Sequence, residues 1–222
     1  EVFVLQAYLR HGVTIADGDC IIDAGSNIGL FTVFANRVAR NLRIFSFEPN
    51  PTVFQCLQAN AAAWGTHTKC FPCGLSSEEK TADMTFFEGF SLLSGFYADE
   101  GTEREVVKNY VLNQQADEGE RARLSADIDR LLEDRFQKRT VTARLRTLSG
   151  VIADEHITSV DLLKVNVEKS ELDVLRGLAS GDWAKIRQLV IEVDLKENLD
   201  PITTLLKQQG YDTFVEQDPL LR

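Results

Sequence analysis

The sequence predicts an α/β protein built on a doubly wound, mostly parallel sheet, and three observations support this fold class. Apolar stretches typical of buried strands alternate along the chain with stretches of helical spacing. The stretch 21–29 (IIDAGSNIG) leads from a strand through a turn of small residues into the helical pattern of 30–39. The strand expected at 159–167 is strongly apolar, as is typical of a central parallel strand. We therefore expect a Rossmann-like sheet.

The N-terminal half supplies three of the expected strands. A short amphipathic helix is expected at 2–10, with Gly12 as its C-cap. The second strand, 43–48, alternates and ends in an acidic residue, and the prolines behind it start a helix that ends at 64–65. A third strand is expected at 70–77, turning at Gly74. With 222 residues, 44% of them hydrophobic, residues 1–222 fit one well-buried domain and are short for two.

An insertion of unusual composition interrupts the alternation at about 90–139. The stretches 82–88 and 140–146 alternate and fit an accessory hairpin. Between them, 101–137 is highly charged but has apolar residues at helical spacing, which indicates two amphipathic helices separated near Gly119. These helices form either a lid or docking surface beside the ligand site, or a solvated helical hairpin without a substrate role.

The C-terminal part completes the predicted sheet. A helix follows the central strand from Ser170, and a further strand is expected at 188–193. The last helix is capped at Gly210, and a strand is expected at 211–216.

The turn at 25–29 is the first candidate site. Its backbone N–H groups at a helix N-terminus suit a nucleotide or nucleoside cofactor. The dinucleotide pattern G-x-G-x-x-G would need glycine at 25, 27 and 30, but the chain has Gly25, Asn27 and Leu30. A nicotinamide-dependent oxidoreductase is therefore disfavoured. Glu48 follows Gly25 at the distance typical of the acid that binds ribose hydroxyls; alternatively it is a solvated strand end, and Gly25 a plain tight turn.

Three polar residues near the end of the central strand form a second candidate. Lys164, Asn166 and Glu168 are spaced by two, so alternation predicts that they share one face of the strand. A polar face on a buried strand needs partners, so this face is either a hydrogen-bonded network or the floor of an active site.

Charge and cysteine content exclude several classes of function. Lys and Arg number 24 against 34 Asp and Glu, a net charge of −10, which disfavours nucleic acid as a partner. The four cysteines include a C-x-x-C pair with His67 upstream, but no second ligand pair, so buried reduced thiols are favoured over a zinc or redox site. We predict no metal. Neither a membrane span nor a signal peptide is evident, and a cytoplasmic setting is expected.

The segments DAGSNIGLFT, FSFEPNP and LLKVNVEKSE, in this order, resemble the FkbM-type S-adenosylmethionine (SAM) methyltransferases. YLRHGVTIADGDCIIDAGSNIG, DWAKIRQLVIEV and VEQD further resemble the members embedded in polyketide synthases and nonribosomal peptide synthetases. Two positions depart from the pattern: Asn166 stands where the family usually has aspartate, and Asp194 where embedded members more often have histidine. The abrupt start at Glu1 fits a domain excised from a larger multidomain synthase.

This resemblance implies the class I SAM methyltransferase fold with a helical lid, SAM as cofactor and S-adenosylhomocysteine (SAH) as product. The expected activity is O-methylation of a polyketide or peptide intermediate held by an acyl or peptidyl carrier protein, beside neighbouring synthase domains. The alternative is a non-catalytic SAM-binding or scaffold domain, because Asn166 lacks the usual carboxylate. The expected cofactor-binding residues are Asp23, Gly25, Asn27, Gly29, Glu48, Pro49, Gly74, Leu75 and Asn166.

An O-methyltransferase must align its acceptor and remove a proton from it, so we expect a general base. The candidates are His11, beside the N-terminal helix, and Glu168, with Lys164 or Asn166 orienting the acceptor or the base. Alternatively, His11 is a favourable charge at a helix end. An acidic carrier protein would need a local basic patch, for which the candidate sources are Arg121, Arg123, Arg135, Lys138 and Arg139.

Overall fold

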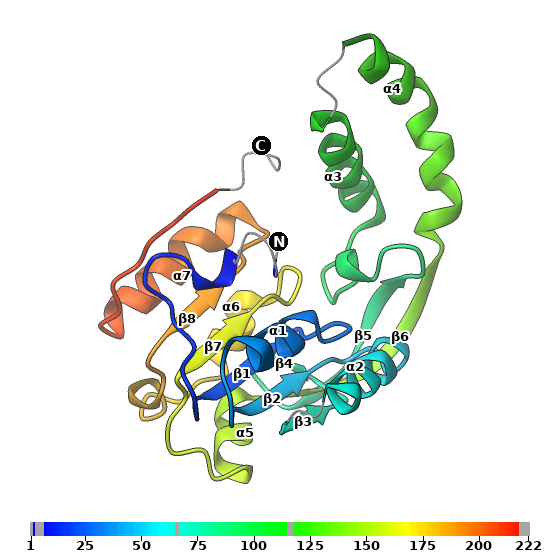
Figure 1. Cartoon of the computed structure of the whole chain (residues 1–222). Helices are drawn as coiled ribbons and strands as arrows, with labels where there is room; N and C mark the ends of the chain where they lie inside the picture. The colour runs from blue at the N-terminus through cyan, green and yellow to red at the C-terminus, as the bar shows by residue number, and fades with distance from the viewer. Residues whose placement is uncertain (1, 3–6, 65–66, 115–117, 218–222) are drawn as a thin grey trace.

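The computed structural model describes residues 2, 7–64, 67–114 and 118–217. Its centre is a five-stranded sheet in the order β3-β2-β1-β7-β8, in which every neighbouring pair is parallel. This confirms the predicted doubly wound sheet (Figure 1). The strands are β1 (Cys20–Ala24), β2 (Arg43–Phe47), β3 (Thr68–Phe71), β7 (Leu162–Val165) and β8 (Leu189–Ile191).

Helices cover both faces of this sheet, because the strands are apolar on both sides. On one face, Ile22 and Val165 pack with buried residues of α5, α6 and α7. On the other face, Ile21 and Leu162 pack with Phe31 and other residues of α1. The helices are α1 (Leu30–Val38), α2 (Pro51–Ala63), α5 (Leu148–Asp154), α6 (Glu171–Arg176) and α7 (Lys196–Gln208), with 3-10 turns η1 (Ala7–Leu9) and η4 (Trp183–Lys185).

The insertion forms a second body on the sheet's flank. Strands β5 (Lys80–Phe87) and β6 (Lys138–Arg146) pair antiparallel, as their alternation predicts, and β4 (Gly74–Leu75) pairs parallel with β6. Between β5 and β6 the chain forms η2 (Ser91–Leu93), α3 (Glu100–Asn113), α4 (Glu118–Glu133) and η3 (Asp134–Phe136). Figure 1 shows α3 and α4 extending away from the parallel sheet. A separate cluster around Phe87, Ile128 and Phe136 holds this arm together.

The structure differs from the sequence-based expectation at both ends. Of the helix expected at 2–10 it describes only the turn η1, since residues 3–6 lie outside the described part of the chain. The strand expected at 211–216 is wrong, because this segment joins no sheet. Tyr211 instead donates its hydroxyl to the carbonyls of Trp183 and Ile186, and Phe214 is 70% exposed. Without a buried face, these residues gain little from pairing with β8.

Candidate functional site

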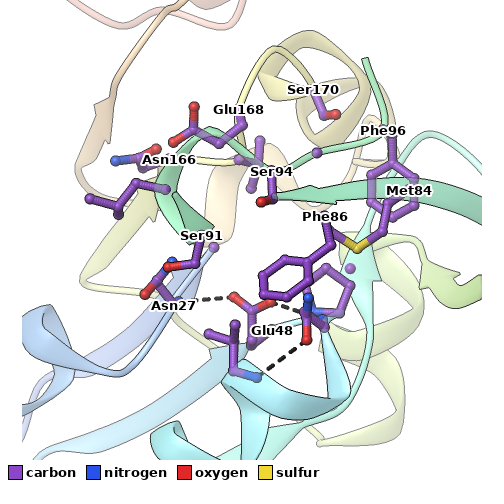
Figure 2. Close-up of a pocket in the computed structure, with 18 of the residues that line it drawn as sticks. Asn27, Glu48, Met84, Phe86, Ser91, Ser94, Phe96, Asn166, Glu168 and Ser170 are labelled. Carbon is purple, nitrogen blue, oxygen red and sulfur yellow. Dashed lines mark hydrogen bonds between the residues drawn. The ribbon is translucent and has the colours of Figure 1, made fainter. Parts of the chain in front are cut away.

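A pocket lies where the carboxyl ends of β1, β2 and β7 meet the inserted sheet. The parallel sheet contributes Gly25, Asn27, Glu48, Asn166 and Glu168. The facing wall comes from β5 and the segment after it. Figure 2 shows Glu48 and Asn27 on one side of this pocket, with Asn166 and Glu168 together on another. This is the edge of a parallel sheet at which ligands commonly bind.

The turn after β1 requires glycine at its first position. Gly25 has a φ of +74°, and a Cβ there would lie 1.7 Å from the carbonyl oxygen of Asn166. The loops after β1 and β7 therefore approach each other too closely for any side chain. The N–H groups of Gly25 and Ser26 both donate to the Phe47 carbonyl, at 3.2 and 2.9 Å, which ties the turn to the end of β2.

Glu48 lies at the end of β2 and is 7% exposed. Its two carboxyl oxygens accept hydrogen bonds from the backbone N–H groups of Asn27 (3.0 Å) and Asn50 (2.8 Å), two of the hydrogen bonds dashed in Figure 2. Burial raises the pKa of Glu48 to about 7, although these two hydrogen bonds oppose the rise. Each oxygen keeps acceptor capacity for a ligand hydroxyl.

A buried ion pair supports the turn from below. Asp23 and Lys164 are register partners on β1 and β7, and the Lys164 ammonium lies 3.0 Å from the Asp23 carboxylate. Lys164 also donates to the Gly25 carbonyl at 2.8 Å, and Thr32 donates to Asp23 at 3.0 Å. Neither Asp23 nor Lys164 lines the pocket. The contacts of Asp23 and Lys164 therefore stabilise the shape of the turn and leave neither side chain in contact with the pocket.

Asn166 follows β7 and is oriented by two partners. Its side-chain amide donates to the Glu192 carboxylate at 2.6 Å and to the Tyr8 hydroxyl at 3.2 Å. Tyr8 in turn donates to the same Glu192 oxygen at 3.2 Å. With the amide nitrogen committed to these partners, the amide oxygen remains available as an acceptor in the pocket wall.

Glu168 stands in a crowded acidic environment. Its pKa is raised to about 9, mainly because the carboxyl is buried. The negative charges of Asp194 and Glu192 raise this pKa further. The pKa of nearby Glu171 is raised to about 8, also mainly by burial. Glu168 has a φ of +51° and the next residue, Lys169, has +73°. The regular alternation of β7 has therefore ended before Glu168, so its approach to the pocket comes from this backbone turn.

The structure brings together most of the predicted site residues. Eight line the pocket: Gly25, Asn27, Glu48, Pro49, Gly74, Leu75, Asn166 and Glu168. Gly29 lies outside it, where a Cβ would meet Leu57 of α2 at 2.8 Å. His11 also lies outside it, stacked on Phe214 with its Nε2 3.0 Å from a carboxylate oxygen of Glu216.

Sequence reasoning missed the wall that the insertion contributes. Met84 and Phe86 of β5, together with Ser91, Ser94 and Phe96 of the following segment, line the pocket. The alternation of 82–88 and 140–146 predicted a hairpin but did not indicate the surface on which that hairpin packs. Asn50 was also missed, although an asparagine before Pro51 is a typical N-cap; its side-chain oxygen accepts from the N–H of Thr52 at 2.9 Å.

The other sequence features take no part in this pocket. Of the candidate basic residues, Lys138 pairs with Glu100 and Arg139 with Glu88, and the side chain of Arg121 lies outside the described residues. All four cysteines are free. Within the described ranges no group of three or more His, Cys, Asp or Glu side chains is arranged to hold a metal ion. None of the described helices combines the length and apolar content needed to cross a bilayer.

Comparison with known proteins identifies relatives along most of the chain. The model of the family "Methyltransferase FkbM domain" matches residues 23–213. The chain is 36% identical over 222 residues to the 31-O-demethyl-FK506 methyltransferase FkbM of Streptomyces tacrolimicus, covering 99% of this chain and 83% of that protein. It is 30% identical over 219 residues to Methyltransferase 1 of Beauveria bassiana, covering 98% and 81%.

A further relative is much longer than this chain. The AMB antimetabolite synthetase AmbE of Pseudomonas aeruginosa is 35% identical over 229 residues, which cover 100% of this chain but only 11% of AmbE. The matched family model spans both the turn at Gly25 and the acid at Glu48, and it extends past Glu168. The chain therefore belongs to the FkbM-type methyltransferases, whose methyl donor is SAM.

Proposed function

We propose that this domain is an O-methyltransferase that transfers the methyl group of SAM to a hydroxyl of a polyketide or peptide intermediate bound to a carrier protein. The observation that carries the proposal is the position of Glu168, a carboxyl with raised pKa in the same pocket as the turn at Gly25 and Glu48. The ionised form of this carboxyl can remove a proton from an acceptor, and the raised pKa makes it a stronger base than an ordinary carboxylate.

The residues of the pocket fit SAM. Two residues in the wall carry buried polar atoms that have no hydrogen-bond partner in the described part of the chain, Asn50 Nδ2 and Ser170 Oγ. One belongs to the β2 side and the other to the β7 side. A ligand with polar groups at both ends, such as an adenosine joined to an amino acid, would satisfy both. Glu48 would accept hydrogen bonds from ribose hydroxyls, and the Asn27 backbone, which donates to Glu48, would fix that carboxyl.

Bound SAM supplies an electrophilic sulfonium methyl group. The protein must then align the acceptor and remove its proton, and alignment alone is worth several kcal/mol of barrier. In our proposal the ionised carboxylate of Glu168 accepts the hydroxyl proton, for a gain of roughly two to four powers of ten in rate. Asn166, held by Tyr8 and Glu192, orients the acceptor through its amide oxygen. Lys164 fixes the shape of the turn after β1, through its ion pair with Asp23 and its hydrogen bond to the Gly25 carbonyl.

The choice of a hydroxyl acceptor has two supports. The name of the Streptomyces relative describes an O-methylation, and a base is needed more for a hydroxyl than for an amine. A carrier-bound acceptor and neighbouring synthase domains are suggested by AmbE, a synthetase in which the matched region is a small part. An acidic carrier protein would still have to overcome the net charge of −10 of this chain.

The test follows transfer from SAM with a labelled methyl group to three acceptors. These are 3-hydroxybutyryl pantetheine, the same acyl group on a carrier protein, and an aminoacyl group on that carrier protein, with products identified by mass spectrometry. We expect methylation of the hydroxyl, faster on the carrier protein, and its loss in Glu168→Gln. The matched control is Glu197→Gln, an exposed residue of α7. Methylation of the amine alone, or equal rates for Glu168→Gln and wild type, would refute the proposal.

A further inference from the structure

The loop between β7 and α6 contains two consecutive residues in the left-handed region, and neither is glycine. Glu168 has a φ of +51° and Lys169 a φ of +73°. This conformation costs a residue with a side chain more than it costs glycine, and such outliers persist where surrounding contacts hold them. Glu168 lines the pocket, but Lys169 does not. The side chain of Lys169 therefore needs its own explanation.

Lys169 connects the loop to the insertion. Its ammonium pairs with the carboxylate of Glu103 in α3, and the two side chains are only 11% and 5% exposed. Burying two charges is unfavourable unless they pair well, so this pair is a specific contact rather than an incidental surface one. The backbone N–H of Lys169 also donates to Asp194, at 3.0 Å. Lys169 is thus held through its side chain by Glu103 and through its backbone by Asp194.

Other contacts join the same two parts of the protein. Gly95 exchanges two backbone hydrogen bonds of 3.0 Å with Thr85 of β5, and a Cβ on Gly95 would lie 3.0 Å from the Glu168 carbonyl oxygen. The Tyr97 hydroxyl donates to Asp173 of α6 at 2.7 Å. The segment that forms the outer wall of the pocket therefore packs directly on the backbone of Glu168, and the ion pair lies just beyond it on α3.

We propose that Lys169 is a positioning residue of the methyl-transfer site. Its pairing with Glu103 fastens the inserted helix α3 to the β7–α6 loop, and thereby keeps Glu168 at the pocket and the outer wall closed over it. The catalytic part of this inference rests on the proposed function, in which Glu168 is the base; the structural part, that the ion pair fastens α3, is independent of it.

Two variants separate the side chain of Lys169 from its backbone. Lys169→Gly keeps the left-handed backbone easily accessible and removes the ammonium, whereas Glu103→Gln removes the partner's charge and leaves residue 169 intact. Lys169→Arg retains the positive charge, and Glu105→Gln is the matched control, an exposed residue of the same helix. The first readout is hydrogen exchange of the α3 amides in the presence of SAH. The second is kcat and KM with SAM and 3-hydroxybutyryl pantetheine.

We expect Lys169→Gly and Glu103→Gln each to raise exchange in α3 and to lower kcat by about tenfold or more, because small displacements of reacting groups have large effects on rate. KM for SAM should change little, and the double variant should be no worse than either single one. Lys169→Arg should recover part of both losses. Unchanged α3 exchange and wild-type kcat in Lys169→Gly would overturn the proposal. If the wild type methylates no hydroxyl, the proposed function fails, and α3 exchange alone still decides whether the ion pair fastens α3.

Discussion

The close approach of the loops after β1 and β7 makes Gly25 the most sensitive position in the proposed site. In Gly25→Ala, the new Cβ would meet the Asn166 carbonyl oxygen at 1.7 Å, so that peptide must retreat by roughly 2 Å to reach an ordinary contact. The left-handed backbone adds about 1–2 kcal/mol, and the overpacking another 1–3 kcal/mol. Because Asn166 lines the pocket, its displacement should also weaken SAH binding, by about tenfold or more.

Gly18→Ala is the matched control for this experiment. Gly18 has a φ of +87°, but a Cβ there would meet no atom within 4 Å, so it carries the backbone cost without the clash. Thermal unfolding should show a decrease of about 2–8 °C in Tm for Gly18→Ala and a larger one, roughly 4–20 °C, for Gly25→Ala. Titration calorimetry with SAH should show a loss only for Gly25→Ala. Equal Tm shifts and wild-type SAH affinity in both variants would refute the reasoning.

Four further predictions concern ionisable residues in the pocket and His11 outside it. SAH should bind more tightly as pH rises through about 7, because ribose hydroxyls favour the ionised form of Glu48. Calorimetry in buffers of different ionisation enthalpy should detect the release of a proton on binding, and Glu48→Gln should abolish this release. The kcat/KM for a hydroxyl acceptor should rise with pH up to about 9 as Glu168 ionises, and a profile that is flat from pH 7 to 9 would count against Glu168 as the base. The free energy of unfolding should fall as pH rises from about 5 to 9, since the raised pKa values of Glu48, Glu168 and Glu171 mean that the folded state binds more protons than the unfolded one. The contribution of Glu48 alone is about 3 kcal/mol. Denaturant titrations that show stability rising over this pH range would contradict the prediction. His11→Ala should leave SAH affinity and turnover unchanged, because His11 does not line the pocket; a large loss in steady-state turnover would restore it as a base candidate.

Sequence reasoning predicted which residues lie together at the carboxyl edge of the parallel sheet, because their proximity follows from the order of the strands along the chain. In a doubly wound sheet the ends of neighbouring parallel strands meet at one edge, so the positions of Gly25, Glu48 and Asn166 at strand ends were enough to predict that they lie close together. The same reasoning could not predict that Asp23 and Lys164 lie outside the pocket. Their pairing depends on the register of β1 with β7, which hydrophobic patterning leaves open.

The side of the pocket formed by Glu168 and the insertion was less predictable, because it depends on tertiary contacts. Alternation along β7 suggested that Glu168 shares a face with Lys164, but the strand ends at Val165, and Glu168 reaches the pocket through a left-handed turn. The packing of Phe86 and Phe96 against the site follows from where the inserted hairpin docks, which no local pattern encodes. The segment 211–216 has an apolar pattern typical of a strand, yet it joins no sheet, and Tyr211 donates its hydroxyl to the carbonyls of Trp183 and Ile186.

The most direct test of the account is a crystal structure of the domain with SAH. We predict that the ribose hydroxyls donate to Glu48, that Asn50 Nδ2 is hydrogen-bonded to the ligand, and that the sulfur faces the side of the pocket on which Asn166 and Glu168 lie. SAH bound away from the Gly25 turn, or with its sulfur remote from Glu168, would contradict the proposed site and its base.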